Sequence, residues 1–260
     1  MFIQESLVVK IVRFLNPEKK IGYGVQEGEV VRAIRGQPYG QIKPSGRSYK
    51  LGDVKLLAPC EPTKIVGVMV NSRKVVEKYN LSMPTEPIVF FKPPSSIINP
   101  GDNIVYPDTS NKVNYEGELA LVIKTRAYRV AKEDALNYVL GYTCFNDVGA
   151  MDWIFGKDHQ RDIGKGYDTF SPFGPCIETD IDPTNADIKV YLNGELVRQG
   201  NTDELIFNAA DQIDFLSHIM TLMPGDILTL GNTGCEGEVK RGDRVEVRIK
   251  GIGSLFNGVV

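Results

Sequence analysis

The chain has 260 residues, of which 42% are hydrophobic and 24% are charged, and its formal net charge at pH 7 is −3. This is the composition of a globular protein, and the lack of any lysine- or arginine-rich block argues against nucleic acid or an anionic membrane as the main partner. The longest apolar runs, such as residues 65–70, are too short to span a bilayer, and residues 1–16 lack the apolar core of an export signal. We therefore expect a cytoplasmic protein.

Cysteine and histidine limit the kinds of metal site that the chain can build. The four cysteines are scattered, without the paired spacing of a zinc site, and are typical of reduced, buried thiols in a cytosolic protein. Only two histidines are present, His159 and His218, so a histidine-rich site is excluded and any metal must be held by oxygen. His218 is interpreted as a packing or surface residue of a helix.

The first part of the chain, residues 1–60, predicts a small β domain without a catalytic constellation. Its apolar, β-branched runs are separated by turn-forming residues. The strands are expected at residues 8–14, 20–25 and 30–34. Pro59 and Pro62 indicate a boundary, after which residues 61–260 form the second domain.

The second domain predicts many short strands joined by turns, with few helices. The strands are expected at residues 64–70, 88–91, 104–106, 114–123, 142–148, 188–192, 195–199, 227–230, 244–249 and 254–256. Asn193-Gly194 suits the tight turn of a hairpin. The fold class expected is therefore mainly β with short helices (α+β).

Helices and irregular segments complete the prediction for this domain. A short helix is expected over residues 132–140, and an amphipathic helix is expected to begin after Asn208, which suits an N-cap. Residues 71–79 are polar and compatible with a helix. Residues 149–164 have the composition of a mobile loop, and residues 165–175 are dense in turn formers and aromatic residues.

Two glutamates stand at the start of the strand predicted over residues 114–123. Because side chains alternate along a strand, Glu116 and Glu118 project from the same face, roughly 6.5–7 Å apart along the backbone. Two like charges beside an apolar run repel each other and lose hydration. A divalent cation held by oxygen ligands would compensate for both effects. The alternative is a pair of surface glutamates at a fraying strand end.

Seven motifs occur in an order that resembles the fumarylacetoacetate hydrolase family, over roughly residues 60–260. They are Lys64-Ile65-Val66 with Asn71, Tyr115-Glu116-Gly117-Glu118-Leu119, Gly141-Tyr142-Thr143 with Asn146-Asp147, Lys165-Gly166-Tyr167-Asp168, Gly174-Pro175, Asn193-Gly194-Glu195, and Pro224-Gly225-Asp226. The resemblance implies a β-roll of the type found in that family, with flanking short helices and usually in a homodimer.

The resemblance also implies a metal centre. It places Mg²⁺ or Mn²⁺ on Glu116, Glu118 and Asp147, where the ion would polarise the ketone of a 2-oxo acid and stabilise its enolate. Members of the family hydrolyse acylpyruvates, decarboxylate oxaloacetate or isomerise 2-hydroxydienoates. Lys165 matches the family's lysine near the metal and is expected to bind the enolate oxygen or the substrate carboxylate. The alternative for Lys165 is a loop ion pair with Asp168.

Several positions depart from the family pattern on the substrate side of the site. Val75 stands at the position of a histidine and Lys78 at that of a glutamate, so the pair that usually activates water is absent. Met151 and Ile154 stand at the positions of an arginine and a glutamine. The remaining departures are Ser72 at the position of a tyrosine and the turn Gly231-Asn232-Thr233 in place of Gly-Thr-Pro. The pattern favours an altered substrate or reaction on a retained metal site.

The function expected is enol–keto isomerisation or tautomerisation of a small 2-oxo acid, as in 2-hydroxyhepta-2,4-diene-1,7-dioate isomerase. Lys165 and Glu77 are the residues expected to move the proton. The alternatives are hydrolysis of an acylpyruvate or fumarylacetoacetate-type carbon–carbon bond, oxaloacetate decarboxylation, sugar-acid dehydration, or an inactive binding protein that keeps a metal. The residues expected to contact substrate are Arg73, Gly231, Asn232 and Thr233.

Overall fold

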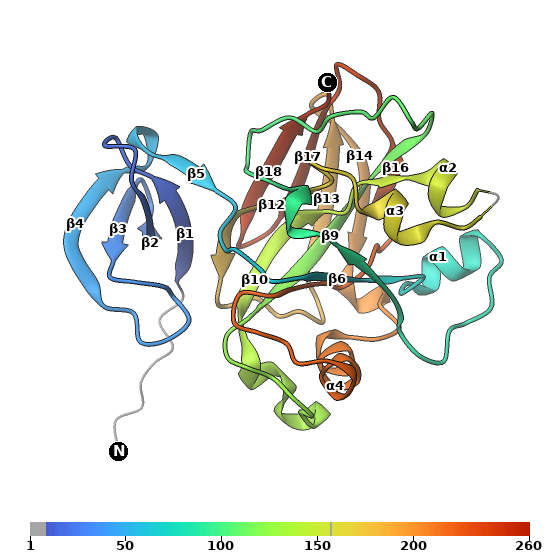
Figure 1. Cartoon of the computed structure of the whole chain (residues 1–260), viewed down its shortest axis with the longest axis horizontal. Coiled ribbons are helices and arrows are strands. Elements are labelled where there is room, and N and C mark those ends of the chain that lie inside the picture. Colours follow the sequence, from blue (N-terminus) through green and yellow to red (C-terminus); the bar gives the residue numbers. More distant parts are fainter. Residues whose placement is uncertain (1–8, 157) are drawn as a thin grey trace.

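The computed structural model describes residues 9–156 and 158–260 and confirms a mainly β fold with short helices (Figure 1). The first strands are β1 (Lys10–Leu15), β2 (Ile21–Glu27), β3 (Val30–Ile34), β4 (Pro44–Lys50) and β5 (Lys55–Leu57). The later strands are β6 (Ile65–Met69), β7 (Ile88–Lys92), β8 (Ile97–Ile98), β9 (Val113–Ile123), β10 (Val139–Asn146), β11 (Gly149–Ala150), β12 (Ser171–Glu178), β13 (Asp187–Leu192), β14 (Glu195–Asn201), β15 (Ile227–Thr229), β16 (Glu236–Glu238), β17 (Arg244–Ile249) and β18 (Gly253–Gly258).

The helices are short. The α-helices are α1 (Arg73–Lys78), α2 (Met151–Ile154), α3 (Arg161–Lys165) and α4 (Ala209–Ile219), and the 3₁₀ turns are η1 (Leu51–Asp53), η2 (Pro94–Ser96), η3 (Lys132–Tyr138) and η4 (Thr202–Glu204). Asn208 caps α4, because its side chain accepts from the backbone N–H of Asp211 while the Asp211 side chain accepts from the backbone N–H of Asn208. The cap predicted for this helix is confirmed. Among the described residues, no helix has the length and apolar character needed to cross a membrane.

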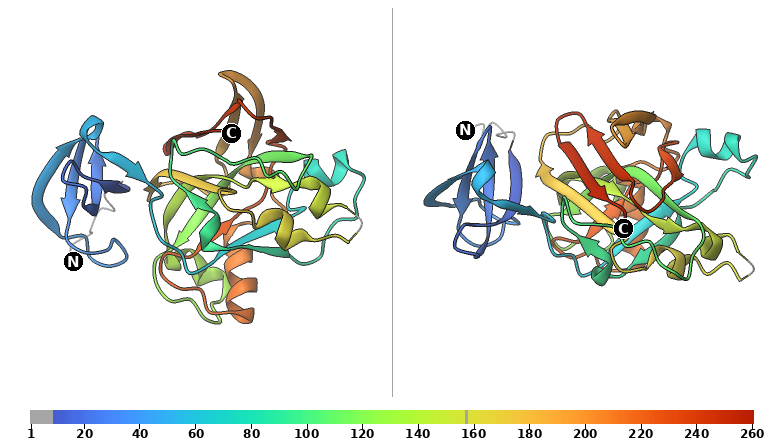
Figure 2. Two further views of the ribbon diagram at one scale, coloured as in Figure 1. Left: turned by 45° about the horizontal axis from the view of Figure 1, so that its top comes forward. Right: turned by 90° about the horizontal axis from the view of Figure 1, so that it is seen from above.

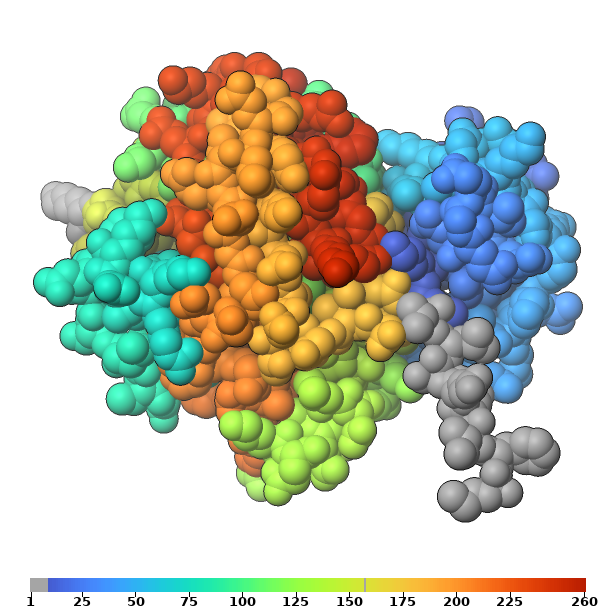
Figure 3. All heavy atoms as spheres, turned by 180° about the vertical axis from the view of Figure 1, so that it is seen from behind, coloured from blue at the N-terminus to red at the C-terminus, as the bar shows by residue number. Residues whose placement is uncertain are grey.

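The strands form two sheets. The larger one runs in the order β4-β3-β2-β1-β12-β10-β9-β15-β6-β7, and the smaller one in the order β14-β13-β17-β18. Strands β1–β5 form a lobe at one side of the molecule (blue in Figures 2 and 3). The lobe joins the body where Lys10 and Ile11 of β1 pair with Glu178 and Ile177 of β12. Because the sheet continues from lobe to body, the domain boundary near residue 60 stays a prediction.

Strand β9 is the centre of the body. It lies between β10 and β15, and its segment from Leu119 to Ile123 is fully buried. The smaller sheet packs against it at Gly117, where a Cβ atom would lie only 2.5 Å from the Val190 side chain. Gly117 therefore lets the second sheet approach the strand that carries both glutamates.

The turn before β15 is anchored by a buried aspartate. Asp226 accepts hydrogen bonds from the backbone N–H groups of Thr63, Lys64 and Met223, and its other contacts are the Thr63 hydroxyl and the Lys64 ammonium. These bonds hold β15 beside β6 in the parallel register of Ile227 with Ile65. The same bonds therefore also position the turn that follows β15, residues 230–234.

The structure corrects several expectations about local structure. The predicted loop over residues 149–164 contains β11, α2 and most of α3, and the predicted turn over residues 165–175 contains the first half of β12. Residues 104–106 form only an isolated bridge, from Ile104 to Val259. The short helix predicted over residues 132–140 is present as the 3₁₀ helix η3, which ends two residues earlier, at Tyr138. Val8, the first residue of the strand predicted over 8–14, lies outside the described residues. Strands β4, β5, β8 and β16 were not predicted.

The four cysteines are free and buried, as predicted: Cys60, Cys144, Cys176 and Cys235. Burial raises the pKa of each thiol. His218 lies at the surface, with its side chain 51% exposed and its Nδ1 atom 2.8 Å from the backbone oxygen of Asp214. The interpretation of His218 as a packing or surface residue is confirmed.

Candidate metal centre and substrate cavity

The register of β9 and β10 brings three carboxylates together. Asn146 at the end of β10 lies opposite Gly117 of β9, so the next residue, Asp147, lies beside Glu116. The Asp147 N–H donates to the Glu116 backbone oxygen at 2.8 Å, and the Glu116 N–H donates to Asn146 Oδ1 at 3.1 Å. Each of Glu116, Glu118 and Asp147 offers an oxygen within 4.8 Å of the others. The structure thus gathers the three predicted metal ligands.

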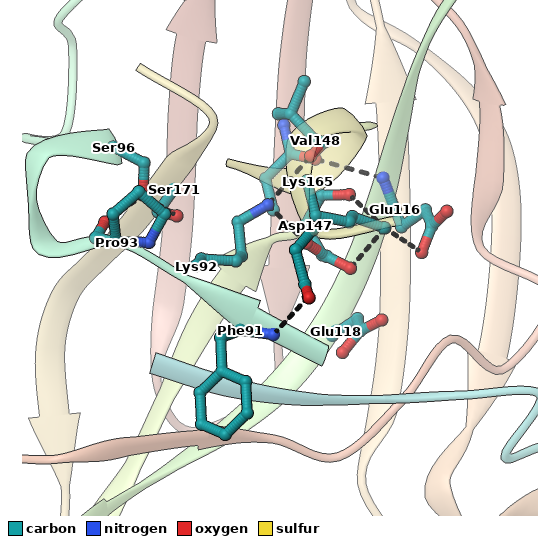
Figure 4. Close-up of polar contacts among 12 residues, drawn as sticks. Phe91, Lys92, Pro93, Ser96, Glu116, Glu118, Asp147, Val148, Lys165 and Ser171 are labelled. Atoms are coloured by element: carbon teal, nitrogen blue, oxygen red, sulfur yellow. Dashed lines mark hydrogen bonds and ion pairs between the residues drawn. The ribbon is translucent and has the colours of Figure 1, made fainter. Parts of the chain in front are cut away.

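Two buried lysines contact this carboxylate cluster (Figure 4). Lys165, the last residue of α3, donates from Nζ to Glu116 Oε2 at 3.0 Å and also contacts Asp147 Oδ2. Lys92, the last residue of β7, donates to Asp147 Oδ1 at 2.6 Å and to the Val148 backbone oxygen at 2.8 Å. The predicted placement of Lys165 beside the metal residues agrees with these contacts, and no ion pair with Asp168 is found among the described residues.

Burial and neighbouring charge shift the pKa values of the cluster in different directions. Burial raises the pKa of Glu118 well above its ordinary value, and the nearby Asp147 and Glu116 carboxylates raise it further. Burial also raises the pKa of Glu116, against the opposing charge of Lys165. Burial alone would raise the pKa of Asp147, but Lys165 and Lys92 together lower it. Of the three carboxylates, Glu118 is therefore the one whose negative charge is least compensated by the lysines.

The pKa values of the two lysines are shifted in opposite directions. Burial alone would lower the pKa of Lys165, but the Asp147 and Glu116 carboxylates raise it, so its ammonium form is favoured. Burial lowers the pKa of Lys92 to about 8, even though Asp147 acts against this shift. The neighbouring carboxylates thus stabilise the charged form of Lys165, whereas burial disfavours the charged form of Lys92.

The turn after β15 closes over Glu118. The Gly231 N–H donates to Glu118 Oε2 at 3.0 Å, and the φ of +107° at Gly231 lies in the region that favours glycine. A Cβ at this position would lie 2.8 Å from Asn71, whose side chain donates to the Leu230 backbone oxygen at 2.7 Å. Gly231 therefore contacts a predicted metal ligand through its backbone.

A cavity of about 490 Å³ lies beside the cluster, with Glu116 and Lys165 among its lining residues. Asn232 also lines it, and its amide donates to Glu236 Oε2 at 2.8 Å. The remaining lining residues are Val68, Met69, Val70, Val75, Tyr79, Leu81, Phe90, Lys112, Asn114, Met151, Ile154, Phe155 and Glu236. Four of the positions that depart from the family pattern thus line the cavity: Val75, Met151, Ile154 and Asn232.

Four of the residues predicted to move a proton or contact substrate do not line this cavity: Arg73, Glu77, Gly231 and Thr233. Glu77 is exposed on α1 and does not line it. Arg73 donates from Nη1 to the Leu205 backbone oxygen at 2.9 Å, and Thr233 is buried with its hydroxyl directed at the Cys235 sulfur, 3.8 Å away. The one-turn helix α1 directs Val75 inward, which leaves its neighbours Arg73 and Glu77 outside the cavity.

The sequence reasoning missed three polar residues of the site. Lys92 is the last residue of β7, one residue beyond the strand predicted over residues 88–91, and it was given no role. Glu236 lies 2.5 Å from Lys78 Nζ on the cavity wall. Asn114 lies two residues before Glu116 on β9, so strand periodicity could have indicated that both face the same side.

The residues present fit a divalent cation. The candidate ligands are all carboxylate oxygens, which hard cations such as Mg²⁺ and Mn²⁺ prefer. With all groups ionised, the three carboxylates and the two lysines give −3 + 2 = −1, and Glu118 has no lysine contact among the described residues. A bound cation would place a positive charge in direct contact with Glu118, with which neither lysine forms an ion pair.

Comparison with known proteins identifies the family. The profile named Fumarylacetoacetate (FAA) hydrolase C-terminal matches residues 64–260, and the profile named Rv2993c-like, N-terminal matches residues 9–59. The mitochondrial oxaloacetate tautomerase Fahd2a of Rattus norvegicus is 37% identical over 218 residues, which cover 80% of this chain and 70% of the rat protein.

Solved structures share the fold along nearly the whole chain. The 2-hydroxyhepta-2,4-diene-1,7-dioate isomerase from Mycobacterium marinum has a TM-score of 0.90 at 35% identity, covering 97% of this chain and 98% of that one. The maleylpyruvate hydrolase from Sphingobium sp. SYK-6, solved with manganese(II) and pyruvate, has a TM-score of 0.79 at 28% identity, covering 96% and 98%. The chain therefore belongs to the fumarylacetoacetate hydrolase family.

Proposed function

We propose that this protein is a divalent-metal-dependent enzyme that interconverts the enol and keto forms of a small 2-oxo acid. The observation that carries the proposal is the buried carboxylate cluster beside a cavity, with Lys165 contacting both Glu116 and Asp147. The names of two relatives, an oxaloacetate tautomerase and a hydroxyheptadienedioate isomerase, support the same class of reaction.

Glu116, Glu118 and Asp147 would hold Mg²⁺ or Mn²⁺, and either ion supplies Lewis-acid polarisation of a 2-oxo carbonyl. Lys165 lines the cavity and keeps a proton on Nζ, so it can donate a hydrogen bond to a substrate oxygen on which negative charge develops. In ketonisation the enol oxygen loses one proton and the adjacent carbon gains one. The reaction therefore needs no co-reactant.

Hydrolysis is less well supported by the cavity. Val75 offers no group that can take a proton from water, and none of the described residues that line the cavity is a histidine. Glu77, the other residue expected to move a proton, is exposed and lies outside the cavity lining.

The homodimer expected from the family resemblance remains part of the proposal, and light scattering of the purified protein is its test.

The test is a spectrophotometric assay of ketonisation in purified protein with Mg²⁺ or Mn²⁺, using the enols of oxaloacetate and phenylpyruvate. We expect turnover that requires the metal and that falls by about 100-fold or more in Lys165→Met, because one electrostatic donor is removed. Lys132→Met is the matched control, since Lys132 is an exposed lysine paired with Asp211 away from the cavity.

Thermal denaturation gives a second readout that does not depend on activity. The wild type is expected to gain stability with Mg²⁺, and Glu118→Gln is expected to lose most of that gain. The proposal is wrong if no enol is ketonised faster than in buffer, or if the protein instead releases pyruvate from acylpyruvates without tautomerising them.

A further inference from the structure

Most of the side chains that line the cavity are apolar. Val75 of α1 and Met151 and Ile154 of α2 are among them. Two further apolar lining residues, Leu81 and Phe155, are 44% and 66% exposed. Large apolar side chains gathered around a cavity favour an apolar ligand, because such a ligand covers surface that water otherwise contacts.

The polar residues that line the cavity include two hydrogen-bond acceptors, Glu236 and Asn114, beside the donors Lys112, Tyr79 and Asn232. Glu236 is held by Lys78 at 2.5 Å and by Asn232 at 2.8 Å, so its charge is kept at the cavity. The Oδ1 atom of Asn114 is buried and has no hydrogen-bond partner among the described residues. A carboxylate placed near the Glu236 carboxylate would be repelled, whereas a neutral group would not.

The charge of the carboxylate cluster limits the substrate in the same direction. The cluster with its two lysines carries −3 + 2 = −1, so a divalent cation brings the total to +1. One substrate carboxylate neutralises this charge, and a second carboxylate would need another cation. Lys112 is a lining lysine without an ion pair among the described residues, and it is exposed.

We propose that the substrate is a 2-oxo acid with a single carboxylate and an apolar, branched or aromatic side chain, which Val75, Met151 and Ile154 contact. The proposal rests on the proposed function, since it assumes that the 2-oxo carboxylate lies at the Glu116 end of the cavity. It adds that this chain selects against dicarboxylates.

The test measures binding by titration calorimetry in Mg²⁺, with phenylpyruvate, 4-methyl-2-oxopentanoate and oxaloacetate as probes. We expect both monocarboxylates to bind about tenfold more tightly than oxaloacetate, and the ketonisation of their enols to show the same order in kcat/KM. Met151→Gln keeps the side-chain length and is expected to weaken phenylpyruvate binding by about fivefold while leaving oxaloacetate unchanged. Met223→Gln, which changes a methionine outside the cavity lining, is the matched control.

Two more variants separate the competing explanations. Glu236→Gln removes the repelling charge and frees Lys78, so oxaloacetate binding is expected to improve several-fold with little change for phenylpyruvate. If oxaloacetate instead binds as tightly as phenylpyruvate and Lys112→Gln weakens only oxaloacetate, the inference is overturned while the proposed function stands. Absence of binding and turnover for both classes would overturn the proposed function and the inference with it.

Discussion

Replacement of Lys92 by methionine tests whether the second buried lysine neutralises the carboxylate cluster. The Lys92 side chain is 0% exposed, and its ammonium donates to Asp147 at 2.6 Å and to Val148 at 2.8 Å. Removing one partner of a buried ion pair costs about 3–5 kcal/mol, because the other charge stays buried. Because methionine is close to lysine in length and is apolar, we expect the low end of this range, which lowers Tm by about 6–12 °C in a chain of this size.

The assay is thermal denaturation of Lys92→Met with chelator and then with Mg²⁺. In chelator the full loss of stability is expected, and in Mg²⁺ the difference from the wild type should narrow, because the cluster without Lys92 carries −3 + 1 = −2 and attracts a cation more strongly. Lys55→Met is the matched control. Its pair with Asp102 is 53% exposed on the lysine side, so its loss should cost less than about 1 kcal/mol.

Two outcomes would refute the reasoning about Lys92. One is a Tm in chelator equal to that of the wild type, which would show that Asp147 is satisfied without this lysine. The other is a stability difference that stays the same or widens when Mg²⁺ is added, which would show that no cation takes over the charge of Lys92.

Two further predictions concern other positions. Burial alone would raise the pKa of Glu236, but hydrogen bonding from Lys78 lowers it. The stability that the wild type gains over Glu236→Gln should therefore be full above pH 4.5, the ordinary pKa of a glutamate, and should shrink as the pH falls below that value. Urea unfolding of both proteins at several pH values measures this difference, and a difference that does not change with pH would contradict the prediction. Gly67→Ala places a Cβ 2.1 Å from the Phe90 ring and should destabilise by about 1–3 kcal/mol, whereas Gly52→Ala, with open space around it, should have little effect in the same measurement.

The carboxylate pair could be predicted from sequence because its geometry is local. Glu116 and Glu118 lie two residues apart on a strand, and strand periodicity alone puts them on one face. Asp147 entered through the family resemblance, since its approach depends on the register of β9 with β10, which is a long-range feature. The capping residue Asn208 was predictable for the same reason as the glutamates: its partners are within three residues.

Other features depended on tertiary structure. Lys92 looks like a solvated charge before two prolines, and only the pairing of β7 with β6 brings it to Asp147. Strand β12 contains two prolines and a glycine, which suggested a turn, yet it pairs with β10. Helices α2 and α3 span about one turn each, too short for apolar periodicity to be visible.

The buried thiols give the molecule its own reporters of local opening. Cys60 lies where the N-terminal lobe meets the body, and Cys235 lies in the turn beside Asn232. Because an exposed thiolate is the nucleophile that attacks a thiol reagent, each buried cysteine reacts only when its surroundings open. Labelling rates read by mass spectrometry would therefore compare how often the lobe junction and the cavity turn unfold, without introducing a single mutation.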